Sequence, residues 1–424
     1  MISRGRIHLL GHCAFGRAFL VALLLVVGAA QLRAESGPIV EVINQEVADL
    51  TTEEVTTRAP QGPPLHIVAG VDMGYDDNIN TSSTPEGAWF TAGVIALTYE
   101  YLNARTQLHL RLGGGLTHYF SSESTEDENA SIVLELTHNF STRFSLTANV
   151  DASYQVEPDF STNIGPENVR AAHLQSTDLF AISYSWLPRL VTITSCTFRR
   201  IMYDDFSIGM FQDRLETTLG EVIQLKRSHR TNVFGEYRYQ MIDYDSVPNN
   251  STTQYGIVGI EHKFTEHIGL TMRGGGSYRS YDQGGDRVDP YFESSFDFSN
   301  GGRSSIRWTT NYGIEDNSGS SGLSVSQTFR TGIQLSYQLS SRITSTATVY
   351  YNHSVDDGSA STQISSGSSQ DSLEMSLNLL YTISRRLKVH LDYGRTSVSS
   401  AGFAPGSAPD YNRNRYFAGL TLIY

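Results

Sequence analysis

From position 65 onward, apolar and polar side chains alternate with a period of two, which is the pattern of β-strands with two different faces. In the first such stretch, every second residue from Leu65 to Tyr75 is apolar or aromatic. The last stretch ends the printed sequence, and it alternates from Tyr416 to Tyr424 with an aromatic residue at each end. An unpaired apolar strand aggregates in water, whereas a sheet that closes on itself can place this face in lipid.

Short turns and longer polar loops alternate between these stretches along the whole chain. This alternation, together with an even number of strands, is typical of outer-membrane barrels, and each stretch has the ~9–11 residues that a tilted strand needs to cross. We therefore predict an all-β fold, a transmembrane antiparallel up-and-down β-barrel of about 18 strands over residues 65–424. The predicted strands are 65–75, 87–100, 104–120, 130–140, 143–157, 172–187, 190–203, 210–226, 230–244, 252–264, 267–281, 288–300, 303–316, 322–339, 342–355, 371–383, 386–397 and 411–424.

A basic residue sits in or just after each short turn, usually behind a large apolar residue. The spacing between successive members is 36 to 46 residues, so one hairpin unit repeats along the chain. A β-propeller or solenoid also repeats near this length, but its strands would be shorter and its loops more uniform. Two or three soluble domains would also fit the length. The basic residues are Arg105, Arg143, Arg189, Arg230, His267, Arg303, Arg342 and Arg386.

The first 64 residues have a different composition. Residues 1–34 combine arginines with a short apolar run and then small residues, which predicts a secretory signal peptide cleaved after Ala30 or Ala34. Residues 35–64 are acidic and proline-flanked, and we expect a periplasmic linker. Cys13 leaves with the signal, so Cys196 remains as a lone thiol without a disulfide partner.

Charge excludes one class of partner. The signal carries four arginines and no acid, which leaves 27 basic against 44 acidic residues in the mature chain, a formal charge of −17. Such an acidic protein is not expected to bind nucleic acid. The expected partners are outer-membrane lipids and the barrel-assembly machinery, and the pattern leaves the oligomeric state open.

The alternation also predicts which residues point into the barrel. The apolar set of each strand is expected to face lipid, and the mostly polar alternate set is expected to face a lumen that side chains alone cannot fill. Its mixed charges suggest either a solvated wall of compensating ions, which we favour, or an anion-selective constriction. The candidate lumen-lining residues are Arg111, Glu135, Asp151, Glu236, Arg238, Arg273, Arg279, Glu293, Asp297, Arg307, Arg330, Glu374, Lys388 and Asp392.

The final strand is a candidate assembly signal. Its outward residues Tyr416, Leu420, Leu422 and Tyr424 are expected to pair with the first strand and to end at the periplasmic girdle. Both termini of the barrel would then lie on the periplasmic side.

Catalytic and metal chemistry find little support. No nucleophile and base stand at diagnostic spacing, and neither a Walker loop nor a zinc spacing is present. Paired carboxylates at 76–77, 204–205 and 356–357 could bridge Ca²⁺, but ordinary turn chemistry explains them as well. We therefore predict no catalytic residue, no metal site and no cofactor.

The stretch from Gly70 to Ile79 contains Tyr75-Asp76-Asp77-Asn78 and resembles the first strand of a family of bacterial β-barrel porins. The tyrosine-rich hairpins and the aromatic C-terminus of residues 65–424 are similar to that family too. The resemblance implies a porin-like channel, and for some members it implies export of exopolysaccharide. We thus expect passive passage of hydrophilic solutes. The alternatives are exopolysaccharide export, with a periplasmic partner bound to residues 35–64, and a structural or adhesive barrel with a plugged lumen.

Overall fold

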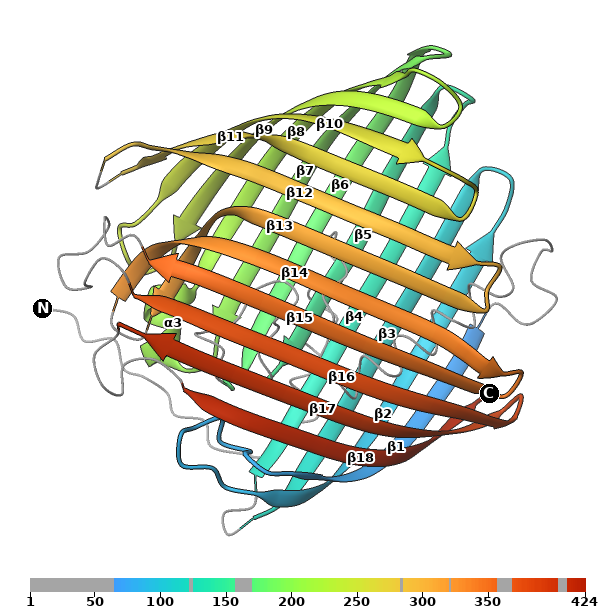
Figure 1. Ribbon diagram of the computed structural model, residues 1–424, viewed down its shortest axis with the longest axis vertical. Helices are drawn as coiled ribbons and strands as arrows, with labels where there is room; N and C mark the ends of the chain where they lie inside the picture. The colour runs from blue at the N-terminus through green and yellow to red at the C-terminus, as the bar shows by residue number, and fades with distance from the viewer. Residues whose placement is uncertain are drawn as a thin grey trace, which may run out of the picture.

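The computed structural model describes residues 65–121, 125–156, 170–282, 285–319, 322–356, 368–402 and 410–424. The predicted signal peptide and periplasmic linker lie outside these residues. The described chain forms one 18-stranded antiparallel sheet whose strands follow one another in sequence order (Figure 1). One helix interrupts the series, and in this part of the chain no helix is both long and apolar enough to cross a membrane.

The strand bounds agree with the predicted series to within a few residues at most ends. The strands are β1 Leu65–Asp76, β2 Ala88–Leu102, β3 Thr106–Phe120, β4 Thr125–Asn139, β5 Phe144–Gln155, β6 His173–Leu187, β7 Leu190–Tyr203, β8 Arg214–Lys226, β9 Thr231–Tyr244, β10 Ser251–Lys263, β11 Ile268–Tyr281, β12 Arg287–Asn300, β13 Ser304–Gly319, β14 Gly322–Ser340, β15 Ile343–Asp356, β16 Ser369–Ser384, β17 Leu387–Ala401 and β18 Tyr411–Ile423.

The sheet closes on itself because β1 pairs with β18 as well as with β2. The closing register runs antiparallel from Val68 opposite Ile423 to Asp76 opposite Arg415. Closure removes both edges of the sheet, which is what a sheet in an apolar medium requires. The predicted antiparallel barrel of 18 strands is therefore confirmed.

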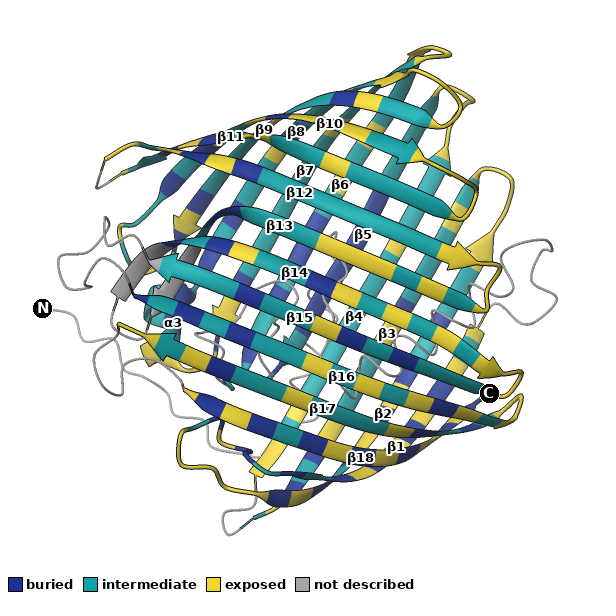
Figure 2. Cartoon of the chain, in the orientation of Figure 1, coloured by how far each residue is buried: buried dark blue, intermediate teal, exposed yellow. Residues whose placement is uncertain are grey.

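The two faces of the strands alternate as the sequence pattern predicts. On β18, the outward residues Tyr416, Leu420 and Leu422 are exposed, and each lies between two buried inward residues (Figure 2). Because strand residues alternate strictly between faces, the registers carry this assignment from strand to strand around the barrel. The outer surface is thus largely apolar in its middle zone.

The short turns share a local mechanism. In six of the eight, a Ser, Thr or Asn accepts a hydrogen bond from the backbone N–H of the basic residue two positions later. Asn103, for example, accepts from the amide of Arg105 at 2.8 Å. Such side chains imitate the backbone of a turn and satisfy an otherwise unpaired donor.

The basic residues of the repeat also join neighbouring hairpins. The carbonyl oxygen of each of the eight accepts a hydrogen bond, 2.7–2.9 Å long, from an amide in the next hairpin along the chain. Arg386 closes the series, because its carbonyl accepts from Ile423 on the last strand. The basic residue of each short turn therefore makes the backbone hydrogen bond, nearest to that turn, that joins its hairpin to the next one.

Three boundaries differ from the prediction. Residues 210–212 were expected in a strand, but they belong to helix α3, Phe206–Gln212, because the carboxylate of Asp205 caps its first turn. The acidic stretch expected as a loop over 121–130 enters β4 at Thr125, and β17 continues to Ala401. In both strands the pairing with neighbours extends past the point where apolar alternation fades.

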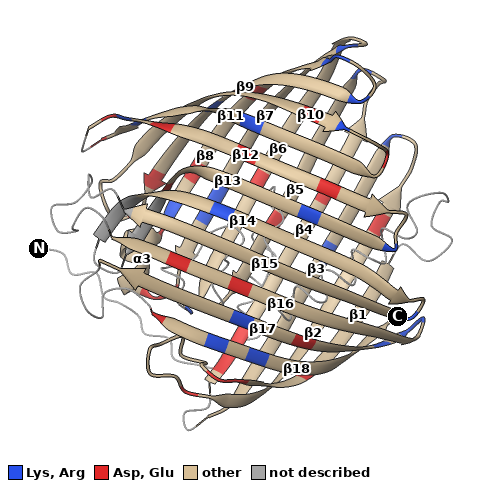
Figure 3. Ribbon diagram, in the orientation of Figure 1, with Lys and Arg blue, Asp and Glu red and all other residues tan. Residues whose placement is uncertain are grey.

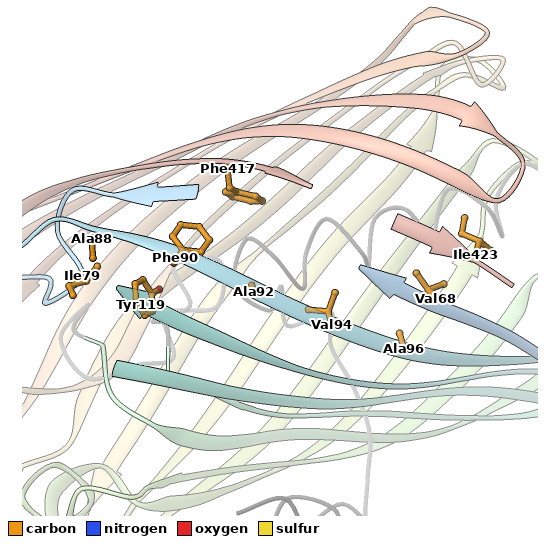
Figure 4. Packing of buried hydrophobic residues seen from close by; sticks show 10 residues of the cluster. All are labelled: Val68, Ile79, Ala88, Phe90, Ala92, Val94, Ala96, Tyr119, Phe417 and Ile423. Carbon is orange, nitrogen blue, oxygen red and sulfur yellow. The ribbon is translucent and has the colours of Figure 1, made fainter. Parts of the chain in front are cut away.

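The inner face of β2 is apolar, although inner faces were expected to be mostly polar. Its inward residues from Phe90 to Ala96 are buried, and the Phe90 ring packs near Tyr119 and Phe417 at centroid distances of 5.6 and 6.2 Å. Small and aromatic side chains here pack beneath the closing strands (Figure 4). The cluster comprises Val68, Ile79, Ala88, Phe90, Ala92, Val94, Ala96, Tyr119, Phe417 and Ile423.

Tyr424 completes the closing pair of strands and generates a first prediction. Its amide donates to the carbonyl of Ile67 at 2.8 Å, and its carbonyl accepts from the amide of Ile67 at 2.9 Å. The residue is 78% exposed, and the centre of its ring lies 5.8 Å from the Arg386 guanidinium. Deleting Tyr424 should lower the yield of inserted barrel more than the conductance of those that insert. Gel mobility before and after heating measures the inserted fraction.

The control for this deletion is Tyr424→Phe, which keeps the backbone bonds and the aromatic ring. We expect the Phe variant to insert with nearly the normal yield. Equal insertion of the deletion variant and the Phe variant would show that the terminal residue has no part in assembly.

Candidate functional site

Charged residues of both signs are spread over the strands of the barrel (Figure 3), and those at inward positions form the candidate functional site. The strand registers place all fourteen predicted lumen-lining side chains at inward positions. Four of them come together on β9, β11 and β12, and the others are distributed around the wall. Their role in conduction stays a prediction.

Glu236, Arg238, Arg273 and Glu293 form a connected group that we call the charge ladder. Arg238 pairs with Glu236 on its own strand and reaches Glu293 at 3.6 Å. Arg273 bridges the same two carboxylates, at 3.2 Å to Glu236 and 3.5 Å to Glu293. The hydroxyl of Tyr291 accepts from Arg238 at 2.9 Å and donates to Glu293. Two arginines and two glutamates thus neutralise one another across three strands.

A second group continues the charge ladder toward the long connections. Glu216 on β8 accepts from Arg214 at 2.9 Å and from Gln240 at 3.2 Å, and it lies 3.5 Å from Arg199. Arg279, which was predicted to face inward, donates to the Thr253 hydroxyl at 2.8 Å nearby. Arg199, Arg214 and Glu216 were missed by the sequence reading, although their positions in the alternation mark them as inward.

The remaining predicted residues occupy separate parts of the wall. Arg307 pairs with Asp297 at 2.7 Å, Arg330 pairs with Glu315, and Asp392 accepts from Asn378 at 2.8 Å. The register sets five more apart from these groups. On β3 to β5, Arg111 and Asp151 lie on either side of Val133, and Glu135 lies between His109 and Asn149. On β16, Glu374 lies opposite Tyr350 and Thr396. On β17, Lys388 lies opposite Thr382 and Thr421.

A buried ion cluster lies on the inner side of the closing strands. Asp76, at the end of β1, has no exposed side-chain surface and accepts hydrogen bonds from Arg413 of β18 at 3.0 and 3.1 Å. Arg415 approaches the same carboxylate at 3.4 Å and donates to the Tyr119 hydroxyl at 3.1 Å. Its guanidinium also lies 4.8 Å from the centre of the Phe90 ring. One buried carboxylate therefore contacts two arginines at the seam.

The next two residues of the Tyr-Asp-Asp-Asn motif extend this contact past the end of β1. The carboxylate of Asp77 accepts from the amide of Asn414 at 2.6 Å and from its side-chain nitrogen at 2.7 Å. Asn78 donates to the carbonyls of Ser82 and Asn412, at 2.9 and 3.0 Å. The motif that carries the family resemblance thus fastens the first strand to the last.

A second buried pair crosses β18. His390 on β17 contacts Asp72 on β1 at 2.8 Å, and both side chains are 2% exposed. The two side chains meet above Gly419, where an added Cβ would lie 1.8 Å from the Asp72 carboxylate and 2.4 Å from the imidazole. Only glycine leaves room for this contact across the intervening strand. Neither Asp72 nor His390 was singled out from the sequence.

At the end with long connections, two of those connections meet inside the mouth. Arg170, which precedes β6, donates to the carbonyl of Ile79 and pairs with Asp127. Its guanidinium lies 5.2 Å from the centre of the Tyr119 ring, and its amide donates to the Thr81 hydroxyl at 3.3 Å. Tyr119 and Asp127 are inward residues, so the connection between β1 and β2 is held against the inner wall.

The carboxylate pairs considered for metal binding have other partners. Asp76 and Asp77 contact arginine and asparagine of β18, Asp204 accepts from a tyrosine of β5, and Asp205 caps α3. Hydrogen bonds from Ser207 lower the pKa of Asp205 below its usual value. The pair 356–357 falls outside the described side chains, and those described include no group of three or more residues suited to hold a metal.

A closed barrel with an apolar outer belt and a charged interior has the architecture of a membrane-spanning β-barrel. The chain matches the family described as "Putative beta-barrel porin 2" over residues 68–424, and it belongs to this family of outer-membrane barrels. Among curated proteins no match is found.

Several solved outer-membrane structures are similar at low sequence identity. OpdK from Pseudomonas aeruginosa is 11% identical, with a TM-score of 0.43 and coverage of 85% of this chain and 98% of that one. OccK5 from the same organism is 11% identical with a TM-score of 0.42, and the match again covers 85% of this chain and 98% of that one. OccAB4 from Acinetobacter baumannii is 10% identical with a TM-score of 0.42, and the match covers 86% of this chain and 99% of that one.

The seam cluster yields a second prediction. Asp76→Asn removes the charge that compensates Arg413 and Arg415 and leaves two guanidinium groups in a buried site. Breaking a buried pair by removing one partner costs about 3–5 kcal/mol. We therefore expect the free energy of unfolding, from urea titrations of the folded barrel in detergent, to fall by that amount.

The matched control is Asp297→Asn, which removes one carboxylate from the half-exposed pair with Arg307. Exposed pairs contribute about 0–1 kcal/mol, so this variant should change the free energy of unfolding much less. Equal losses in the two variants would contradict a special role for the seam.

A third prediction concerns the contact across Gly419. In Gly419→Ala the new methyl group forces Asp72 and His390 apart, which leaves buried polar groups without their mutual hydrogen bond. The expected loss of stability is about 1–3 kcal/mol in the same titration. Gly394→Ala is the control, because its Cβ would have no neighbour closer than 3.9 Å. A harmless Gly419→Ala variant would be inconsistent with the packing.

Proposed function

We propose that the protein is an outer-membrane channel for the passive passage of hydrophilic solutes, with its short turns and both barrel termini on the periplasmic side of a Gram-negative envelope. Membership of a porin family and the closed 18-stranded barrel support this proposal. Barrels of 16–18 strands are too wide for their side chains to fill.

The observation that carries the proposal is the exposure of charged groups inside the barrel. Asp297 and Arg307 are inward residues, and their side chains are 49% and 52% exposed. Arg273 and Glu293 of the charge ladder are 34% and 28% exposed. Charged groups keep this much open surface only where water reaches them, because an unsolvated charge is very costly. A hydrated interior supports a path for polar solutes.

The same contacts favour a channel of weak ion selectivity. In the charge ladder, both arginines contact both glutamates, and Arg307 and Arg330 have a carboxylate partner each. A solute passing this wall meets compensated charge instead of an uncompensated ring of one sign. This arrangement supports the solvated wall over an anion-selective constriction.

Export of exopolysaccharide is less well supported by the aromatic residues of the wall. That function would use open aromatic faces as platforms for sugars. Most inward rings are largely covered, although Tyr255, Tyr281 and Tyr350 are partly exposed. Arginines lie over several of the covered rings, as Arg238 lies over Tyr291 and Arg273 over Phe234. At most 9% of each of the following inward residues is exposed: Phe90, Tyr119, Tyr203, Phe234, Tyr244, Tyr291, Tyr411 and Phe417.

Single-channel recording in planar bilayers tests the channel and yields a fourth prediction. Replacing Glu236 and Glu293 by glutamine leaves Arg238 and Arg273 uncompensated in the wall. The reversal potential in a salt gradient should then shift toward anion selectivity, and low salt should enlarge the shift because screening is weaker.

Glu221→Gln is the control, because Glu221 lies on the outer face of the adjacent strand β8, where it accepts from Thr194 at 2.6 Å. It removes one carboxylate without changing the lumen and should leave the reversal potential unchanged. An absence of stepwise current from the unaltered protein would contradict an open channel and favour a plugged, structural barrel.

A further inference from the structure

The two ends of the barrel carry opposite charge. The eight short turns contain nine arginines, all exposed, and a single acid, Glu266. The described parts of the long connections carry nine acids and one arginine, Arg170. The acids contribute to a protein of net negative charge, so the basic end is a local exception to its composition. The nine turn arginines are Arg105, Arg143, Arg189, Arg227, Arg230, Arg303, Arg342, Arg385 and Arg386.

These arginines form a ring around the full circumference, because every short turn except the one at His267 contributes at least one. We call them the turn ring. No acid among the described residues pairs with any of them, in contrast to the arginines of the inner wall. In five of the seven turns that contain arginine, an Asn or Ser side chain accepts from the backbone amide of an arginine, so the turn backbone is fixed while the arginine side chain stays exposed.

The position of the turn ring relative to the apolar belt identifies the kind of partner it fits. Exposed apolar side chains precede the turns on the outer face, including Phe140 at 51%, Leu187 at 62% and Leu339 at 52%. The arginines lie directly beyond this belt. Arginine keeps its apolar stem along such a surface while its charged head reaches the water interface. This is the level at which lipid headgroups meet the hydrocarbon core.

We infer that the turn ring binds the phosphodiester groups of anionic phospholipids in the leaflet next to the short turns. The planar guanidinium matches phosphate oxygens with two parallel donors, and many such contacts around the barrel add together. The ring would hold the barrel at a fixed depth and favour insertion with the basic end toward this leaflet. The inference requires a barrel that lies in a bilayer, and it does not depend on whether the lumen conducts.

The test measures how anionic lipid changes thermal stability. The full mature chain is folded into vesicles of phosphatidylcholine, with or without phosphatidylglycerol, and the midpoint of unfolding is read from heat-modifiable gel mobility. Phosphatidylglycerol should raise the midpoint, and added salt should reduce this shift. Replacing Arg143, Arg230, Arg342 and Arg386 by glutamine removes four of nine arginines, so the shift should fall by about half.

A matched pair of double variants separates the turn ring from total charge. Arg143→Gln with Arg342→Gln should reduce the lipid-dependent shift. Arg307→Gln with Arg395→Gln removes the same charge from the lumen and from the outer face near the long connections, and it should leave the shift intact. Each variant is compared with itself in the two lipids, so a change in basal stability does not obscure the result.

Two outcomes would overturn the inference. The first is an equal loss of the shift in both double variants, which would mean that only net charge matters. The second is a similar rise in the midpoint when soluble glycerol phosphate is added to phosphatidylcholine vesicles. That result would assign the turn ring to phosphate esters in solution instead of a lipid surface. Conductance is recorded separately, so a closed lumen would not be mistaken for failure of lipid binding.

Discussion

Closure of the sheet between its first and last strands is the constraint on which the rest of the barrel depends. An open edge in lipid would leave a row of backbone donors and acceptors without partners, and water is not present to replace them. The strand pairing between β1 and β18 ends where Asp76 faces Arg415. Beyond that point, the backbone amide of Asp77 donates to the carbonyl of Asn414 at 3.1 Å, and the side chains of Asp77 and Asn78 continue the contact with β18.

Closure also sets the distribution of charge in the molecule. Strict alternation around a closed ring sends every second residue into a shared interior, where opposite charges can compensate one another over several strands, as they do in the charge ladder. The residues at the two ends of the barrel do not face one another across a common interior. Each end faces a different surface, and there the charges separate, with arginine in the short turns and acids in the long connections. A compensated interior and polarised ends are consistent with one barrel that meets water within and two unlike interfaces outside.

The period of two was enough to predict the strands, their number and the inward position of residues such as Arg238 and Glu293. Successive side chains of a strand point to opposite faces, so an odd or even position in the strand decides which face a residue occupies. Partners were not predictable in the same way. Asp76 looked like a turn residue, and its partner Arg413 lies 337 positions away along the chain. The contact between Asp72 and His390 depends on a glycine of a third strand. Helix α3 was missed because its cap, Asp205, reads equally well as part of a loop.

The family motif and the charge ladder lie in different parts of the barrel. Tyr75 packs outward against Trp89 of β2 at a centroid distance of 5.4 Å, while Asp76 points inward to the arginines of β18, so the motif joins β1 to both of its neighbouring strands. In a ring of 18 strands, the ladder on β9, β11 and β12 lies on the side opposite β1. A resemblance carried by this motif therefore reports how the barrel closes. The charge ladder, past which the proposed solutes would move, lies half a circumference away, so its residues can change while the seam stays the same.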